Sequence, residues 1–82
     1  TDELAMVMAF APQTGRVKFA LNNARQAAMP DVKRPGTWVA RFGPTEIAKS
    51  AGVREHEVRR ILEMEKLDGR LEYGDRLIRF MN

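Results

Sequence analysis

One break inside an apolar, helix-periodic stretch constrains the fold of this chain more than any other feature. The stretch is TEIAKSAGVREHEVRRIL, residues 45–62. Its apolar side chains recur at helical spacing on both sides of the break: Ile47 and Ala48 before it, and Val58, Ile61 and Leu62 after it. Gly52 lies between the two runs, and glycine tolerates the left-handed backbone that ends a helix. The stretch therefore predicts a short helix, a tight turn and a longer helix over residues 54–68, which Gly69 ends.

The chain ahead of this pair predicts further helices and one strand. Residues 1–10 (TDELAMVMAF) carry two acids near their start, which suits the positive end of a helix dipole. Pro12 is expected to open a second helix, because proline is tolerated in a first turn. Residues 29–36 (MPDVKRPG) predict a loop, and residues 37–42 (TWVARF) predict a short strand. The second helix has a narrow apolar stripe formed by Val17, Leu21, Ala24 and Ala28.

The tail of the chain predicts a β-hairpin over residues 70–80. Gly74-Asp75 suits a two-residue turn with a positive first φ, which would place Leu71 opposite Ile78. The expected order is helix, helix, strand, short helix, tight turn, longer helix and hairpin. This order predicts a mainly α fold with a small antiparallel sheet, a winged helix-turn-helix in which the hairpin is the wing. The core is expected to contain the five methionines and the aromatic residues Trp38, Phe42, Tyr73 and Phe80.

The longer helix of the pair has a polar side that suits either of two roles. Helical periodicity leaves His56 and Arg60 on the side opposite the apolar stripe. Such a side is often only a solvated surface. Helix-turn-helix proteins instead place the amino-terminal half of this helix in the major groove, where arginine donates to guanine and a carboxylate accepts from cytosine. The candidate base-reading residues are Glu55, His56, Arg59 and Arg60.

Contacts with DNA phosphates are expected from groups beside that helix. Gly43 as cap and Pro44 in the first turn would leave free amide groups at the start of the short helix, next to the Thr45 hydroxyl. Arg54 lies where a serine or aspartate cap would be expected, which indicates that this arginine serves another purpose. Arg76, at the tip of the wing, can reach a phosphate or the minor groove, or can simply discourage edge-to-edge aggregation.

The composition argues against several other classes of protein. The chain has 82 residues, enough for one domain, with no cysteine and one histidine, so neither a disulfide scaffold nor a protein-only metal site is expected. The sequence has no glycine-rich phosphate loop and no nucleophile–base pair, so neither a cofactor nor enzyme activity is expected. The longest apolar run is too short to cross a bilayer, which makes a cytoplasmic protein without a membrane partner the default expectation. The first residue is Thr1, which leaves open whether the chain is processed or a piece of a longer protein.

The charge pattern keeps more than one binding function open. The net charge of +3 favours a polyanionic partner only weakly, and basic and acidic residues nearly balance over residues 41–82. One interpretation is a winged helix that reads double-stranded DNA. A second is a winged-helix module that binds other proteins, and a third is a replication or plasmid-partition domain that uses the same surface.

Several segments also occur in the order of a known family. They are AFAPQTGRVKFALNNARQ, a strand ending in Phe42, PTEIAKSAGVREHEVRRILEMEK and a terminal hairpin. The most telling positions within them are Thr14-Gly15-Arg16, Glu46-Ile47, Val58 and Arg60-Ile61-Leu62. In this order and spacing they resemble the DNA-binding domain of the Crp/Fnr family of bacterial transcription regulators.

The resemblance implies a sequence-specific winged helix that acts as a homodimer on a palindromic DNA site, with RNA polymerase as a further candidate partner. Residues 1–10 would be the end of the family's dimerisation helix, and residues 11–82 would be the winged-helix domain. No residue here matches the family's effector-binding barrel, so no cofactor site is carried over. Glu55 and His56 stand where the family commonly has arginine and glutamate, so the family's usual target sequence is not implied. The target, the signal sensed and the direction of regulation stay open.

Overall fold

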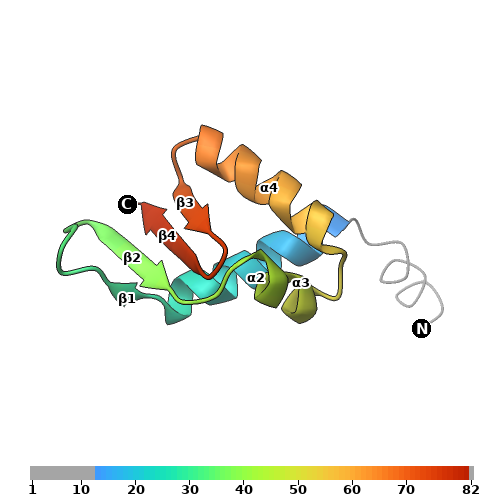
Figure 1. Cartoon of the computed structure of the whole chain (residues 1–82), viewed down its shortest axis with the longest axis horizontal. Helices are drawn as coiled ribbons and strands as arrows, with labels where there is room; N and C mark the ends of the chain where they lie inside the picture. The colour runs from blue at the N-terminus through green and yellow to red at the C-terminus, as the bar shows by residue number, and fades with distance from the viewer. Residues whose placement is uncertain (1–12, 82) are drawn as a thin grey trace.

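The computed structural model describes residues 13–81, and within that range it contains three helices and a four-stranded sheet (Figure 1). In chain order the elements are α2 Gln13–Ala27, β1 Met29–Pro30, β2 Thr37–Ala40, α3 Pro44–Ala51, α4 Glu55–Leu67, β3 Leu71–Gly74 and β4 Leu77–Met81. The predicted fold class, a mainly helical winged helix with a small antiparallel sheet, is confirmed. The helix expected over residues 1–10 and the helix start expected at Pro12 lie outside the described residues.

The helices pack through the apolar faces that the sequence predicts. Their buried residues are Val17, Ala20, Leu21 and Ala24 on α2, Ile47 and Ala48 on α3, and Val58, Ile61 and Leu62 on α4. Gly52 has a φ of 69° and donates its N–H to the Ala48 carbonyl, so it ends α3 as predicted. Arg54 occupies the cap position of α4 without a side-chain cap bond. Gly69 follows the end of α4 with a φ of 75°.

The four strands form one antiparallel sheet in the order β1-β2-β4-β3. The two residues of β1 pair with Trp38 and Val39 of β2, so the predicted loop over residues 29–36 is wrong at its first two positions. A proline is tolerated there because β1 is an edge strand, where a missing N–H breaks no ladder. β2 ends at Ala40, earlier than predicted, because Phe42 turns to pack against the core instead.

The wing has a different register from the predicted one. Its two-residue turn lies at positions 75–76, one residue later than predicted, and it has no positive φ. Leu71 therefore lies opposite Phe80, not opposite Ile78. This register pairs two buried apolar side chains across the hairpin. The predicted register would place Phe80 opposite Gly69, whose backbone already serves to end α4.

The core lies between the helices and one face of the sheet, and the side chains buried in it differ in part from those predicted. Among the aromatic residues Phe80 is buried, whereas Phe42, Tyr73 and Trp38 are partly buried. The prediction of methionine core fillers is wrong for Met29 and Met64, which are 70% and 55% exposed. Both positions point away from the core: Met29 lies on an edge strand, and Met64 is off the buried stripe of α4. Composition alone could not reveal this.

An ion-pair network joins the loop after β1 to the strands of the wing. Arg34 Nη1 lies 2.9 Å from Glu72 Oε1. Arg79 reaches the same carboxylate at 3.3 Å and Asp31 at 3.3 Å. The hydrogen bond from Arg34 lowers the pKa of Glu72, and the backbone N–H of Lys33 lowers the pKa of Asp31. The folded state therefore favours the ionised form of both carboxyl groups.

This network is expected to make the stability of the chain fall in acid. The folded pKa of Glu72 lies below its ordinary value of 4.5, so its carboxylate stabilises the fold above that value and the contribution is lost as pH falls through the folded pKa. The urea midpoint should drop between about pH 5 and pH 3. Arg34→Gln should make that drop shallower, whereas Arg41→Gln, at an exposed arginine, should not. An unchanged pH dependence in Arg34→Gln would contradict this account.

Candidate nucleic-acid interface

The polar side of α4 faces solvent along the amino-terminal half of the helix. The side chains of His56 and Arg60 are 67% and 52% exposed. Val58, between them in sequence, is fully buried. Figure 1 shows the amino-terminal end of α4 close to α3, at the end of the molecule away from β1 and β2. The polar side of α4 therefore faces outward as predicted, and the candidate base-reading residues are accessible to a partner.

Glu55 connects the start of α3 to α4. Its Oε1 atom accepts hydrogen bonds from the Thr45 hydroxyl at 3.2 Å and from Arg59 Nε and Nη2 at 3.2 and 2.9 Å. Its Oε2 atom accepts none from the described residues. One half of this carboxylate thus orders the surface, while the other half can accept a hydrogen bond from a ligand.

Arg59 and Gly43 connect the wing to this surface. Arg59 Nη2 lies 3.8 Å from the carboxylate of Asp75 in the wing turn. The same turn touches the cap of α3 so closely that a Cβ on Gly43 would collide with the Asp75 carbonyl. Figure 1 shows the turn between β3 and β4 beside the chain that enters α3. The start of α3, the exposed half of α4 and the wing turn therefore form one continuous surface, here named the α3–α4–wing surface.

Arg60 is held by neighbours from two helices. Its Nη2 atom donates to Glu57 Oε2 at 3.0 Å and to the Thr14 hydroxyl of α2 at 3.4 Å. Its Nη1 atom lies 3.8 Å from the sulfur of Met64. A guanidinium group has more N–H donors than these contacts use. Arg60 is therefore fixed in direction and still able to donate to a ligand.

The three residues predicted to contact phosphates flank this surface but differ in their present contacts. The Thr45 hydroxyl already donates a hydrogen bond to Glu55. Arg54 and Arg76 are exposed, and their side chains make no hydrogen bond or ion pair with other residues of the range 13–81. The cap Gly43 offers α3 no side-chain bond, so the amide groups of the first turn remain available to an anion.

A hollow of about 440 Å³ opens beside the amino-terminal end of α4. It is lined by Gln13, Gly52, Val53, Arg54, His56 and Glu57. The first described residue of α2 thus lies next to two of the predicted site residues, Arg54 and His56. The surface extends beyond the helix pair and the wing onto the leading helix, which the sequence did not predict.

Tyr73 anchors the wing to the middle of α4. Its hydroxyl donates a hydrogen bond of 2.7 Å to Glu63 Oε2. This bond lowers the pKa of the Glu63 carboxyl group and raises the pKa of the Tyr73 hydroxyl. The wing is therefore held to α4 by its strand β3, at Tyr73, as well as by its turn, at Asp75.

Sequence reasoning missed the contributions of Gln13, Thr14 and Asp75 to this surface. The contact of Glu57 with Arg60 could have been predicted from the sequence, because residues three apart on a helix are neighbours. The contact of Thr14 with Arg60 could not, since the two residues lie 46 positions apart in the sequence. The place of Asp75 could not be predicted either, because it depends on the register of the wing.

The described part of the chain offers no group of three or more His, Asp or Glu side chains placed to hold a metal ion. None of its helices has the length and apolar character needed to cross a bilayer.

Comparison with known proteins identifies the fold. No model of a known protein family and no curated protein matches the chain. Solved structures do match, among them CprK, described as complexed with OCPA, with a TM-score of 0.68 and 18% identity over 99% of this chain. The chain spans 38% of the length of that CprK chain. The chain therefore shares its fold with that part of CprK, and the Crp/Fnr resemblance seen in the sequence is supported at the level of the fold alone.

Proposed function

We propose that this chain is the DNA-binding part of a transcription regulator and that it binds double-stranded DNA in a sequence-specific manner. In this proposal residues 54–68 enter the major groove, and the wing, residues 70–80, lies on the backbone. The observation that carries the proposal is the continuous α3–α4–wing surface with its exposed polar half of α4. The fold shared with CprK supports it.

The candidate base-reading residues keep unused hydrogen-bonding capacity. Glu55 has one carboxylate oxygen without a described partner, His56 is exposed, and Arg60 retains free donors. Arg59 is held by Glu55 and by the wing, so it would read a base from a fixed position. Acids among these residues repel phosphates, which lowers the affinity for DNA of arbitrary sequence. Binding would then depend on matched bases more than on backbone charge.

Phosphate contacts in this proposal come from groups around the base-reading residues. Arg54 and Arg76 supply cations without a described partner, and Thr45 lies at the free amide groups of α3. A single chain of this kind covers one half-site, so we propose that the longer protein binds as a homodimer to two half-sites spaced by about 10 bp, with residues 1–10 in the dimer contact.

A titration of the chain with a random-sequence duplex and with a selected duplex tests the proposal. With two unpaired arginines on phosphates, the logarithm of the association constant should fall against the logarithm of salt with a slope of about −2 or steeper. Affinity for the random duplex should then drop about tenfold between about 50 and 200 mM salt. The selected duplex should bind more tightly at both concentrations. A folded chain that binds neither duplex would favour the protein-binding interpretation instead.

A further inference from the structure

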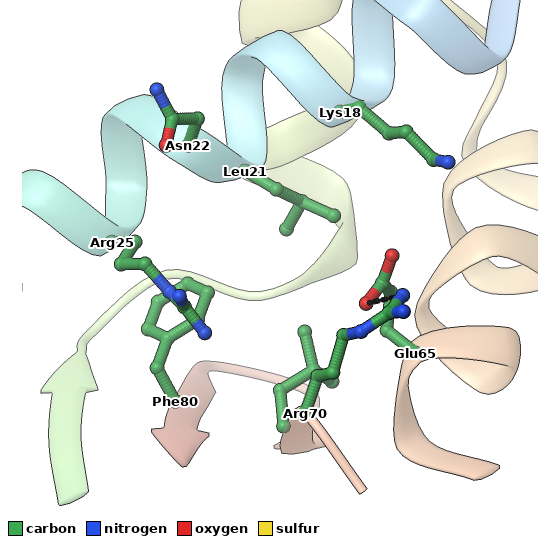
Figure 2. Close-up of a pocket in the computed structure, with 8 residues that line it drawn as sticks. Lys18, Leu21, Asn22, Arg25, Glu65, Arg70 and Phe80 are labelled. Carbon is green, nitrogen blue, oxygen red and sulfur yellow. Dashed lines mark hydrogen bonds and ion pairs between the residues drawn. The ribbon is translucent and has the colours of Figure 1, made fainter. Parts of the chain in front are cut away.

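A second hollow, of about 220 Å³, lies between α2, the last turns of α4 and the wing strands (Figure 2). Its floor is formed by three buried core side chains, Leu21, Leu71 and Phe80. Charged side chains surround the floor: Lys18 and Arg25 from α2, and Glu65 and Arg70 facing them. The hollow is therefore apolar at its base and charged at its rim.

The two cations on the α2 side are not neutralised by described carboxylates. Lys18 makes no side-chain hydrogen bond or ion pair with other residues of the range 13–81. Arg25 lies over the Phe80 ring, with its guanidinium carbon 5.4 Å from the ring centroid, and donates a long bond of 3.5 Å to the Met81 carbonyl. α2 contains no acidic residue along its whole length. An anion can therefore approach both side chains without displacing an existing ion pair.

The facing side of the hollow argues against nucleic acid as its ligand. Arg70 is already paired with Glu65 at 3.2 Å and with Asp68 at 3.5 Å. A nucleic acid carries a phosphate at every nucleotide, so a strand laid across the hollow would also meet Glu65, whereas a short peptide can place its carboxylates on the Lys18–Arg25 side alone. The apolar floor offers nothing to a phosphate, whereas it can desolvate an aliphatic or aromatic side chain.

The size of the hollow favours a single side chain over a small molecule. Sites for small molecules usually enclose about 300–1,000 Å³, and this hollow is smaller and open to solvent on one side. Shallow sites of this kind accept an anchor side chain from a partner protein. Carboxylates beside such an anchor would lie next to Lys18 and Arg25, because those two side chains share one side of α2.

We propose that this hollow binds a short acidic peptide segment of a partner protein, with one apolar side chain on the Leu21–Leu71–Phe80 floor. The site uses the carboxyl-terminal half of α4, whereas the base-reading residues lie in its amino-terminal half. It contains none of the residues proposed to read bases or to contact phosphates. The inference does not depend on DNA binding, and each can fail without the other.

A labelled peptide, acetyl-Glu-Asp-Leu-Asp-Glu-amide, tests the site by fluorescence anisotropy and by amide NMR shifts of the whole chain. We expect saturable binding that Lys18→Glu weakens about tenfold, because the reversal turns an attraction into a repulsion. Lys49→Glu is the matched control: Lys49 is an exposed lysine of α3 outside the hollow, and its reversal changes the net charge equally. It should leave the affinity nearly unchanged.

Serine in place of the peptide's leucine should also weaken binding, since the floor loses its apolar contact. Equal weakening by Lys18→Glu and Lys49→Glu would indicate general charge attraction and would overturn the site. Displacement of the peptide by a random-sequence duplex would overturn it too, because the peptide would then occupy the DNA surface. So would the absence of saturable binding at millimolar peptide. Amide shifts centred on Lys18, Arg25 and Arg70 would support the site.

Discussion

Replacing Gly43 by alanine is expected to lower the free energy of unfolding by about 1–3 kcal/mol and to displace the wing. The added Cβ would overlap the main-chain carbonyl of Asp75, which cannot rotate away as a flexible side chain can. Gly43 has a φ of −113° and a ψ of −163°, an extended conformation that alanine also adopts. The cost therefore comes from the collision, and either the wing turn or the start of α3 must shift. Urea unfolding followed by circular dichroism measures the change.

Gly15→Ala is the matched control for this substitution. Gly15 is an exposed residue of α2, and a methyl group added to it would meet no atom within 4 Å. The same change should therefore stabilise the helix there by about 0.5–1 kcal/mol. Displacement of the wing should also move Arg76 and weaken DNA binding in Gly43→Ala. A Gly43→Ala chain as stable as the original would show that the wing is not seated on the cap of α3.

Arg60→Ala should lose about 1–3 kcal/mol of binding free energy on a selected duplex, and it should relax the choice of base at one position. A guanidinium group reads guanine through two parallel hydrogen bonds, and alanine can form neither. Arg60→Lys should recover only part of the loss, because an ammonium group keeps the charge without the planar fork. Selecting bound duplexes from a random pool, for the original chain and for each variant, measures both effects.

Arg76→Ala is the comparison that separates base reading from phosphate contact. Loss of a phosphate contact should weaken binding by a similar factor for all sequences and should reduce the salt slope by about 1. A sequence-selective loss in Arg76→Ala would contradict its proposed role. If Arg60→Ala selects the same duplexes as the original chain, Arg60 does not read a base and the assigned register of the helix is wrong.

The helices could be predicted from the sequence because each one has a single buried face. Val58, Ile61 and Leu62 mark that face on α4 without any knowledge of what packs against it. The register of the wing could not be predicted in this way. Moving the partner of Leu71 from Ile78 to Phe80 keeps the same side chains on the same face of the sheet, so alternation does not distinguish the two. The choice depends on the tertiary packing, in which the buried side chains of Leu71 and Phe80 lie opposite each other.

The accessible side of the candidate interface could be predicted for the same reason as the helices. Periodicity places His56 and Arg60 outward, and both are exposed. The contacts that hold Arg59 in place could be predicted only in part. Glu55 and Arg59 are four residues apart on one helix, a spacing visible in the sequence. The contact of Arg59 with Asp75 depends on the tertiary fold, and no local pattern reveals it.

The hydrogen bond from Arg60 to Thr14 makes the direction of the Arg60 side chain depend on the position of the first turn of α2. A small shift of that turn would carry the Thr14 hydroxyl away from the guanidinium and leave Arg60 in contact with Glu57 and Met64. A movement of α2 would thus change the direction of the Arg60 side chain on α4 while both helices stay folded. Such a shift would break only one exposed hydrogen bond of 3.4 Å, so it would change the rotamer populations of Arg60 at little cost in stability.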